Sequence, residues 1–210
     1  MKRYLLLLIM GLSLTSFSQQ LQLTPSFGAS TYYRIFPDEY YSNPNDFKLT
    51  TNAGFTYIHH LEKISFSIGV DITNYAGKHL DGSYGMSHYY KSEGDFSNKT
   101  IGFTFGLIDK MFNDKLEMNY GFSINYRTAS SRTGYVSWAT IGGDAHYSNL
   151  DSEGGKKTLT FLTYGISYPV AISEQMAIVP QYQMAIGITQ EYNDYRRWSN
   201  YLGCGLRYQF

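Results

Sequence analysis

The final stretch of the chain, residues 198–210, alternates between two kinds of side chain without interruption. Its even positions are mostly large and apolar, from Trp198 to Phe210, and its odd positions are small or polar, as at Gly203 and Arg207. Successive side chains of a β-strand point to opposite faces, so this period of two predicts a strand with one apolar face. A single strand leaves its backbone groups unpaired, so we expect this segment to belong to a larger sheet.

Seven earlier segments show the same period of two. They cover approximately residues 21–35, 47–59, 64–73, 100–107, 116–127, 157–170 and 176–192. The cleanest is 64–73, where Ile64, Phe66 and Ile68 alternate with serine and glycine. Pro180 falls inside the seventh segment and lacks the N–H that a closed sheet requires, so we expect a β-bulge there.

The connections between these segments alternate in length. Long connections, rich in Tyr, Ser, Asn, Asp and Gly, are expected at about 36–46, 75–98 and 128–156, with a shorter one at 193–197. Short turns are expected near 60–62, 110–114 and 173–175. Long loops on one side and short turns on the other are typical of bacterial outer-membrane barrels, and an even number of strands places both chain ends at the periplasmic side.

Alternation alone leaves two kinds of eight-stranded barrel open. In a lipocalin-like barrel the apolar face points inward to a ligand and the polar face meets water. Here the polar face is mostly Gly, Ser, Thr, Asn and Gln, whereas a surface that meets water usually carries many charged residues. Small polar side chains fit a narrow eight-stranded interior, which favours a transmembrane barrel.

Tyrosine is abundant near the ends of the apolar face. Amphipathic rings prefer the boundary between membrane and water, so these residues predict two aromatic girdles. The simpler interpretation is that tyrosine favours strands in general. The tyrosines concerned are Tyr33, Tyr57, Tyr75, Tyr120, Tyr126, Tyr168, Tyr182, Tyr192 and Tyr208.

The beginning of the chain predicts export. Lys2 and Arg3 precede the apolar run 4–14, and the small residues Ser16 and Ser18 suit a cleavage site, so residues 1–18 are expected to be a signal peptide. Residues 19–210 are then a single barrel domain. Without Lys2 and Arg3 the chain has 15 basic and 17 acidic residues, a balance that does not favour nucleic acid as a partner. The single Cys204 excludes an intramolecular disulfide and is expected to act as a small apolar residue.

The segment 19–210 as a whole resembles the small, eight-stranded OmpA/OmpX-type outer-membrane barrels. The resemblance implies an all-β fold, an eight-stranded antiparallel up-and-down transmembrane barrel, in the outer membrane of a Gram-negative bacterium. It also implies contact with outer-membrane lipids and lipopolysaccharide, and insertion by the barrel-assembly machinery, with Tyr208 and Phe210 in the terminal insertion signal. No cofactor is expected.

Charged residues on the inward face are the first candidates for chemistry. The register places Asp71, Glu117, Arg127 and Arg207 in the lumen, together with Lys48. Buried charges must be paired, so an ion-pair network that fills the lumen is the simplest expectation. The alternative is a path for protons or ions, although an eight-stranded barrel is just wide enough for its own side chains.

The histidines are the second candidates, and all five are expected in loops or turns. His88 with Ser87 and Ser92, or His146 with Ser148 and Asp144, would be the groups of an outer-membrane lipid-modifying enzyme such as a lipid A deacylase. Catalytic triads depend on geometry rather than on adjacency in sequence, and no strand is expected to carry a Ser–His pair. No His or Cys spacing suits a zinc site. We therefore expect a protein that is not an enzyme.

Aromatic residues in the long loops are the third candidates. Tyr mixed with Ser, Gly and Asn is a composition suited to recognition, although such loops can also simply shield the barrel. The candidates are Tyr40, Tyr41, Tyr84, Tyr89, Tyr90, Tyr135, Trp138 and Tyr147. The expected function is that of a scaffold, a surface-interaction protein or an accessory subunit of a larger outer-membrane complex, and the alternatives are the lipid-modifying enzyme and a secreted lipocalin-like ligand binder.

Overall fold

The computed structural model describes residues 19–33, 48–61, 64–84, 88–112, 115–140, 143, 146–149, 156–191 and 196–210. The expected signal peptide and the loop expected at 36–46 lie outside these residues. The strands are β1 (Gln19–Tyr33), β2 (Lys48–His60), β3 (Ile64–Tyr84), β4 (His88–Met111), β5 (Leu116–Thr140), β6 (His146–Asn149), β7 (Thr158–Ser167), β8 (Val170–Ala171), β9 (Met176–Gly187) and β10 (Arg196–Gln209). Within the described residues, no helix is sufficiently long and apolar to cross a membrane.

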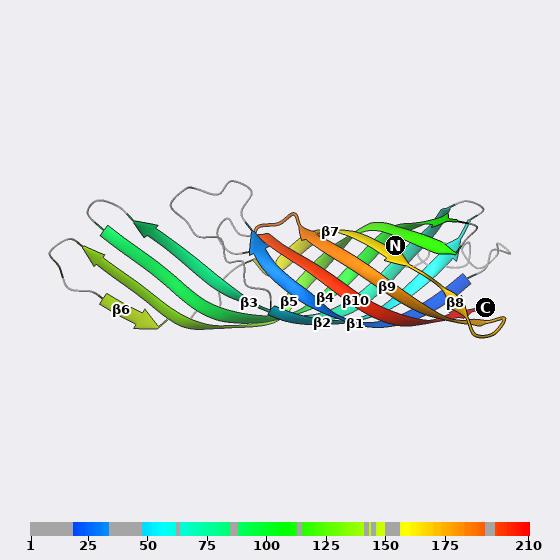
Figure 1. The fold of residues 1–210 in the computed structure, drawn as a ribbon, viewed down its shortest axis with the longest axis horizontal. Coiled ribbons are helices and arrows are strands. Elements are labelled where there is room, and N and C mark those ends of the chain that lie inside the picture. Colours follow the sequence, from blue (N-terminus) through cyan, green and yellow to red (C-terminus); the bar gives the residue numbers. More distant parts are fainter. Residues whose placement is uncertain are drawn as a thin grey trace, which may run out of the picture.

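The strands close into an antiparallel barrel (Figure 1). Neighbours follow the order β10-β1-β2-β3-β4-β5-β7-β9, and β9 pairs with β10 to complete the circle. The two-residue β8 pairs with β9 in the register of β7 and therefore continues β7, and β6 pairs only with the far part of β5. Eight strands thus surround the lumen, which confirms the predicted eight-stranded antiparallel up-and-down barrel.

The apolar face of the strands points outward. Exposed side chains on the outer surface include Leu23, Phe55, Phe66, Ile68, Val70, Phe103, Phe105, Phe122, Ile124, Leu162, Ile178, Leu202 and Leu206. The inward positions between them are polar and buried, as at Thr24, Thr50 and Thr73. This arrangement is the reverse of a lipocalin-like barrel and is that of a transmembrane barrel, because a surface this apolar requires lipid around it.

Short connections lie at one end of the barrel, here called the turn end. They join β2 to β3, β4 to β5 and β8 to β9 around residues 61–63, 112–115 and 172–175. Both described chain ends lie at this end too, because the amide N–H of Phe210 donates to the carbonyl oxygen of Gln19 over 3.0 Å.

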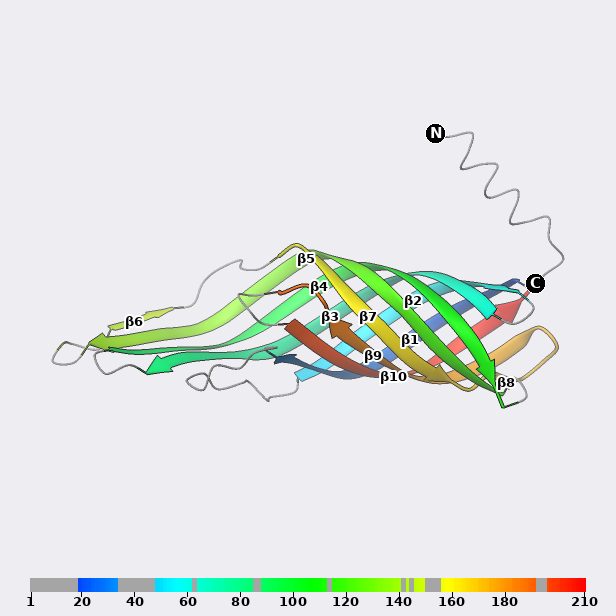
Figure 2. The ribbon, with the colours of Figure 1, turned by 90° about the horizontal axis from the view of Figure 1, so that it is seen from above.

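Beyond the opposite end of the barrel, three strands continue as a sheet, here called the extension (Figures 1 and 2). β3 pairs with β4 up to Tyr84 and Tyr89, and β4 pairs with β5 up to His88 and Thr140, whereas β2 leaves β3 at Tyr75. At about 3.3 Å per residue the extension projects roughly 30 Å. The prediction of loops at 75–98 and 128–156 was therefore wrong over most of both ranges. The described side chains of the extension form no buried apolar core, so the alternation that marks a strand in sequence is weak there.

Irregularities in the barrel also differ from expectation. The register is continuous through Pro180, so the predicted bulge is absent. The ladder instead stops between β7 and β8, where the N–H of Tyr168 donates to the carbonyl oxygen of Pro180 over 3.0 Å and proline offers no N–H in return. A bulge does occur where β5 leaves the barrel, with Thr128 as the extra residue opposite Lys99 and Thr100.

Candidate functional site

The lumen contains balanced buried charges. Among the described residues, three carboxylates and three guanidinium groups are buried on the inward face: Asp71, Glu117, Glu191, Arg127, Arg197 and Arg207. A buried charge without a partner is strongly destabilising, so equal numbers of opposite charges are what a filled lumen requires. Five of them form two layers, one near the turn end and one at the mouth below the extension, and Asp71 lies apart from both.

The layer near the turn end is centred on Arg207. Its two terminal nitrogens each donate to one carboxylate oxygen of Glu117 over 2.7 Å, and its Nε donates to Oε1 of Gln22 over 2.8 Å. Ser167 donates a further hydrogen bond of 3.0 Å to Glu117. This two-point pairing uses the planar fork of arginine fully and holds strands β1, β5, β7 and β10 together.

His60 lies in the same part of the lumen. Its Nδ1 is 2.5 Å from Oγ of Ser65, on the neighbouring strand β3. The expectation that all five histidines lie in loops or turns was wrong, because every one falls within a strand, and β2 and β3 do carry a Ser–His pair. Both side chains are buried, so this pair faces neither lipid nor water outside the barrel.

The layer at the mouth is centred on Glu191, which follows β9. Its Oε1 accepts hydrogen bonds from the hydroxyl of Tyr75, from Nδ2 of Asn98 over 3.3 Å and from an Arg127 nitrogen over 2.8 Å. The donors stand on β3, β4 and β5, so this one carboxylate links the end of β9 to three other strands. Glu191 is 2% exposed, so its carboxylate is buried at the mouth.

Arg197 completes this layer by stacking. Its guanidinium carbon lies 3.3 Å from the ring centroid of Tyr75 and 4.4 Å from that of Phe161, so the cation is held between two aromatic faces. Phe161 belongs to an apolar cluster with Leu159, Ala185 and Tyr201 that fills the lumen beside it. Tyr75 is 1% exposed, so its predicted place on the apolar outer face was wrong: it follows Asp71 and Thr73 on the inward face.

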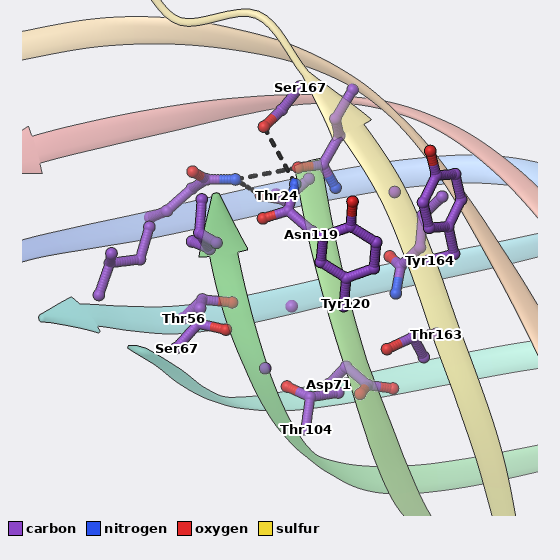
Figure 3. A pocket seen from close by; sticks show the side chains of 18 of the residues that line it. Thr24, Thr56, Ser67, Asp71, Thr104, Asn119, Tyr120, Thr163, Tyr164 and Ser167 are labelled. Carbon is purple, nitrogen blue, oxygen red and sulfur yellow. Dashed lines mark hydrogen bonds between the residues drawn. The ribbon is translucent and has the colours of Figure 1, made fainter. Parts of the chain in front are cut away.

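A cavity of about 130 Å³ lies in the lumen and reaches the Arg207 layer. Figure 3 shows its polar lining, with Asp71, Thr104, Asn119 and Thr163 contributed by β3, β4, β5 and β7. Asp71 is fixed at its edge, because its Oδ1 accepts hydrogen bonds from Nδ2 of Asn52 over 3.1 Å and from the Thr73 hydroxyl over 3.0 Å. This part of the lumen is therefore a polar chamber that reaches the Arg207 layer.

The four residues predicted for the lumen all lie there, but in three places. Glu117 and Arg207 pair with each other, Arg127 pairs with Glu191, and Asp71 is held by neutral side chains. The side chain of Lys48 lies outside the described residues. Sequence reasoning missed Glu191 and Arg197, although each has the odd number of the inward positions in its strand. Continuing the alternation past the apolar part of the strand would have found both.

The predicted recognition residues are spread over the extension. Tyr89 and Tyr90 are half-buried, whereas Tyr135 and Trp138 are each 41% exposed. Tyr84 and Tyr147 lie in β3 and β6, with side chains outside the described residues, and Tyr40 and Tyr41 fall outside them entirely.

Side-chain contacts within β4 and between neighbouring strands order the extension. Lys91 pairs with Glu93 over 2.8 Å, and the Tyr135 hydroxyl donates to the same carboxylate over 2.9 Å. The hydrogen bonds that Lys91 itself donates, to Glu93 and then to the Tyr135 hydroxyl, raise the pKa of Lys91 above its usual value. On β5 and β6, Trp138 stacks against His146 with ring centroids 5.4 Å apart.

The residues of the predicted insertion signal and the single cysteine are exposed. Tyr208 and Phe210 are exposed at the turn end and meet edge to face at 5.1 Å. Cys204 is exposed on the outer face. Within the described part of the chain, no group of three His, Cys, Asp or Glu residues is arranged to hold a metal ion.

Comparisons with known proteins give a likeness of fold only. No family model matches the chain, and no curated protein matches it. Among solved structures, the attachment invasion locus protein Ail of Yersinia pestis, crystallised with the heparin analogue sucrose octasulfate, is 13% identical with a TM-score of 0.42, over 90% of this chain and 99% of that one. Neisserial surface protein A is 13% identical with a TM-score of 0.43, over 90% and 97% of the two chains. The outer-membrane protease OmpT of Escherichia coli is 9% identical with a TM-score of 0.38, over 95% and 100%. These values say nothing about what this chain binds or whether it is an enzyme.

Proposed function

We propose that this chain is a non-enzymatic outer-membrane barrel that presents the extension to a partner, either at the cell surface or as an accessory subunit of a larger membrane complex. The observation that carries the proposal is the extension itself. Two neighbouring strands of a barrel need only a short turn to connect them. Here β3, β4 and β5 instead continue as a sheet for roughly 30 Å beyond the barrel.

The closed lumen supports a role outside the barrel rather than transport through it. The Glu117–Arg207 pair and the Glu191 layer cross the interior with buried, hydrogen-bonded side chains. An eight-stranded barrel has little room beyond its side chains. The buried Ser65–His60 pair gives no accessible nucleophile, which supports a role without catalysis.

The strands and the expected signal peptide together support an outer-membrane location. An exported barrel with an apolar exterior inserts among outer-membrane lipids, with the turn end toward the periplasm and the extension outside. On this proposal the tyrosines at strand ends contact the membrane boundary and lipopolysaccharide, and the terminal strand is read by the barrel-assembly machinery.

The proposal is tested by shortening the extension. Residues 77–96 are replaced by Asn-Gly, which joins the paired Ala76 and Ser97 through a two-residue turn. Both proteins are expected to be heat-modifiable on gels, because the barrel pairing is untouched. Native-detergent purification is expected to recover a partner with the full chain and to lose it with the shortened one. Equal recovery from both chains would refute a role for the extension.

A second measurement addresses the lumen. Purified full-length protein in planar bilayers is expected to show no stable channel, since both layers cross the interior. A steady conductance typical of an open pore would replace the proposed function with transport.

A further inference from the structure

A row of residues across three strands brings oxygen atoms together inside the lumen. Asp71 on β3 lies opposite Gly102 on β4, and Gly102 lies opposite Asn125 on β5. Because Gly102 has no side chain, its neighbours lean over it from both sides. The position that a Cβ of Gly102 would take is 2.6 Å from Oδ1 of Asn125, 2.6 Å from Oδ2 of Asp71 and 2.9 Å from its Oδ1.

The carboxylate of Asp71 is held in this orientation. Asn52 and Thr73 both donate to Oδ1, which fixes the group from β2 and β3. Of the two carboxylate oxygens of Asp71, Oδ2 lies nearer to the position that a Cβ of Gly102 would take. Asp71 is only 9% exposed and both of its hydrogen-bond donors are neutral side chains, so a positive group in direct contact would stabilise its charge.

The amide of Asn125 supplies the second, independent observation. Asn125 is 5% exposed, and its Oδ1 is buried without a hydrogen-bond donor among the described residues. The hydroxyl oxygen of Thr100, two residues from Gly102 on β4, is likewise buried without a hydrogen-bond partner. A buried acceptor without a donor is destabilising, and a carboxylate and an amide oxygen that converge on one point repel each other unless a positive charge lies between them.

We propose that Asp71 and Asn125 hold a small monovalent cation, of the class of Na⁺, beside Gly102. The atoms that converge here are all oxygens, which hard cations prefer as ligands over nitrogen or sulfur. One carboxylate provides a single negative charge, and Arg197 is close enough to act electrostatically on Asp71, so a divalent ion would be poorly compensated. The adjoining polar chamber, which Asp71 also lines, provides room for water to complete the coordination. The site is independent of the proposed role of the extension.

Two glycines in the same row provide a matched test. Gly102→Ala places a methyl group where the oxygens converge and blocks the site. Gly54 lies opposite Asp71 on the other side, and there a Cβ would make only ordinary contacts, 3.5 Å to Cβ of Asp71 and 3.8 Å to Oδ1 of Asn52. Gly54→Ala therefore changes the same kind of residue beside the same carboxylate and leaves the site open.

The wild type and both variants are refolded from urea into detergent in NaCl or in choline chloride at equal ionic strength, and thermal midpoints are read from heat-modifiable gels. The wild type and Gly54→Ala are expected to melt higher in NaCl, by an amount that grows with the logarithm of Na⁺ concentration. Gly102→Ala is expected to melt at the same temperature in both salts. Equal wild-type midpoints in the two salts would overturn the site and indicate that the Asn125 amide is rotated to donate to Asp71. A Na⁺ dependence that survives in Gly102→Ala would overturn it as well.

A third variant keeps the test decisive if Gly102→Ala does not fold. Asn125→Asp adds a second carboxylate at the same point, so the site is expected to take up a divalent ion, and CaCl₂ is expected to raise the midpoint of this variant but not that of the wild type. An Asn125→Asp variant that responds to Ca²⁺ no more than the wild type does would contradict the proposed coordination.

Discussion

At the scale of single residues, the lumen shows how a narrow polar interior accommodates charge. Each buried carboxylate lies within reach of donors from other strands, and Glu117 is paired at both oxygens with Arg207. Such pairs add little stability over apolar residues of the same size, because both charges lose their water. Their effect is specificity, since a strand in the wrong register would leave a charge alone.

A double-mutant cycle tests this interpretation. Arg207→Met leaves the Glu117 carboxylate buried without its partner, and we expect a loss of about 3–5 kcal/mol in the free energy of unfolding. Glu117→Gln combined with Arg207→Met removes both charges and is expected to recover most of that loss. Urea unfolding in lipid vesicles, followed by tryptophan fluorescence, measures all three. A double variant as unstable as Arg207→Met alone would contradict the reasoning.

At the scale of elements, the interruption between β7 and β8 has a single cause. The N–H of Tyr168 bonds to Pro180 on β9, and the return bond is missing because proline has no N–H. In lipid a backbone carbonyl without a hydrogen-bond partner is costly.

We therefore expect Pro180→Leu to stabilise the barrel. The new N–H can donate to the carbonyl oxygen of Tyr168 and join β7 to β8, which is worth about 0.5–1.5 kcal/mol in the free energy of unfolding. Hydrogen exchange would show a protected amide at residue 180. Pro169→Leu is the control, because hydrogen-bonding positions alternate along an antiparallel pair and residue 169 does not bond to β9. A stabilisation by Pro169→Leu of the same size would point to a general effect of removing proline.

The candidate site was predictable from sequence only where alternation was strong. Asp71 and Glu117 fall in segments whose opposite face is clearly apolar, so their inward direction could be deduced. Glu191 and Arg197 follow the same parity, but Glu191 stands at the end of the expected segment 176–192 and Arg197 falls just before the expected final strand. The extension escaped prediction for the same physical reason, because its segments have no clearly apolar face from which alternation could be recognised.

At the scale of the whole molecule, the barrel is turned inside out relative to a water-soluble protein. Polar side chains pack the interior and apolar side chains cover the exterior, while closure of β9 on β10 removes free edges. The three strands of the extension continue beyond this apolar exterior.

The apolar exterior predicts that the cost of a charged substitution on the outer face depends on its depth in the membrane. Ile68→Arg places a charge on the exposed apolar face in the middle of β3, and we expect it to destabilise the barrel by about 2–4 kcal/mol in vesicles. Asn74→Arg lies on the same outward face of the same strand near its exit from the barrel, and we expect a loss of at most about 1 kcal/mol. Equal effects of the two substitutions would show that the outer face does not lie in lipid.

The sequence by itself determined the fold class, the number of strands around the lumen and the direction of most side chains, because a period of two is a local property of each strand and survives without knowledge of its neighbours. The tertiary structure alone decided which charges meet, since Arg207 and Glu117, or Arg127 and Glu191, are far apart in the chain and are brought together only by strand order and register. It also decided that β3, β4 and β5 run on beyond the barrel, because pairing between strands, rather than any pattern within one of them, holds the extension together.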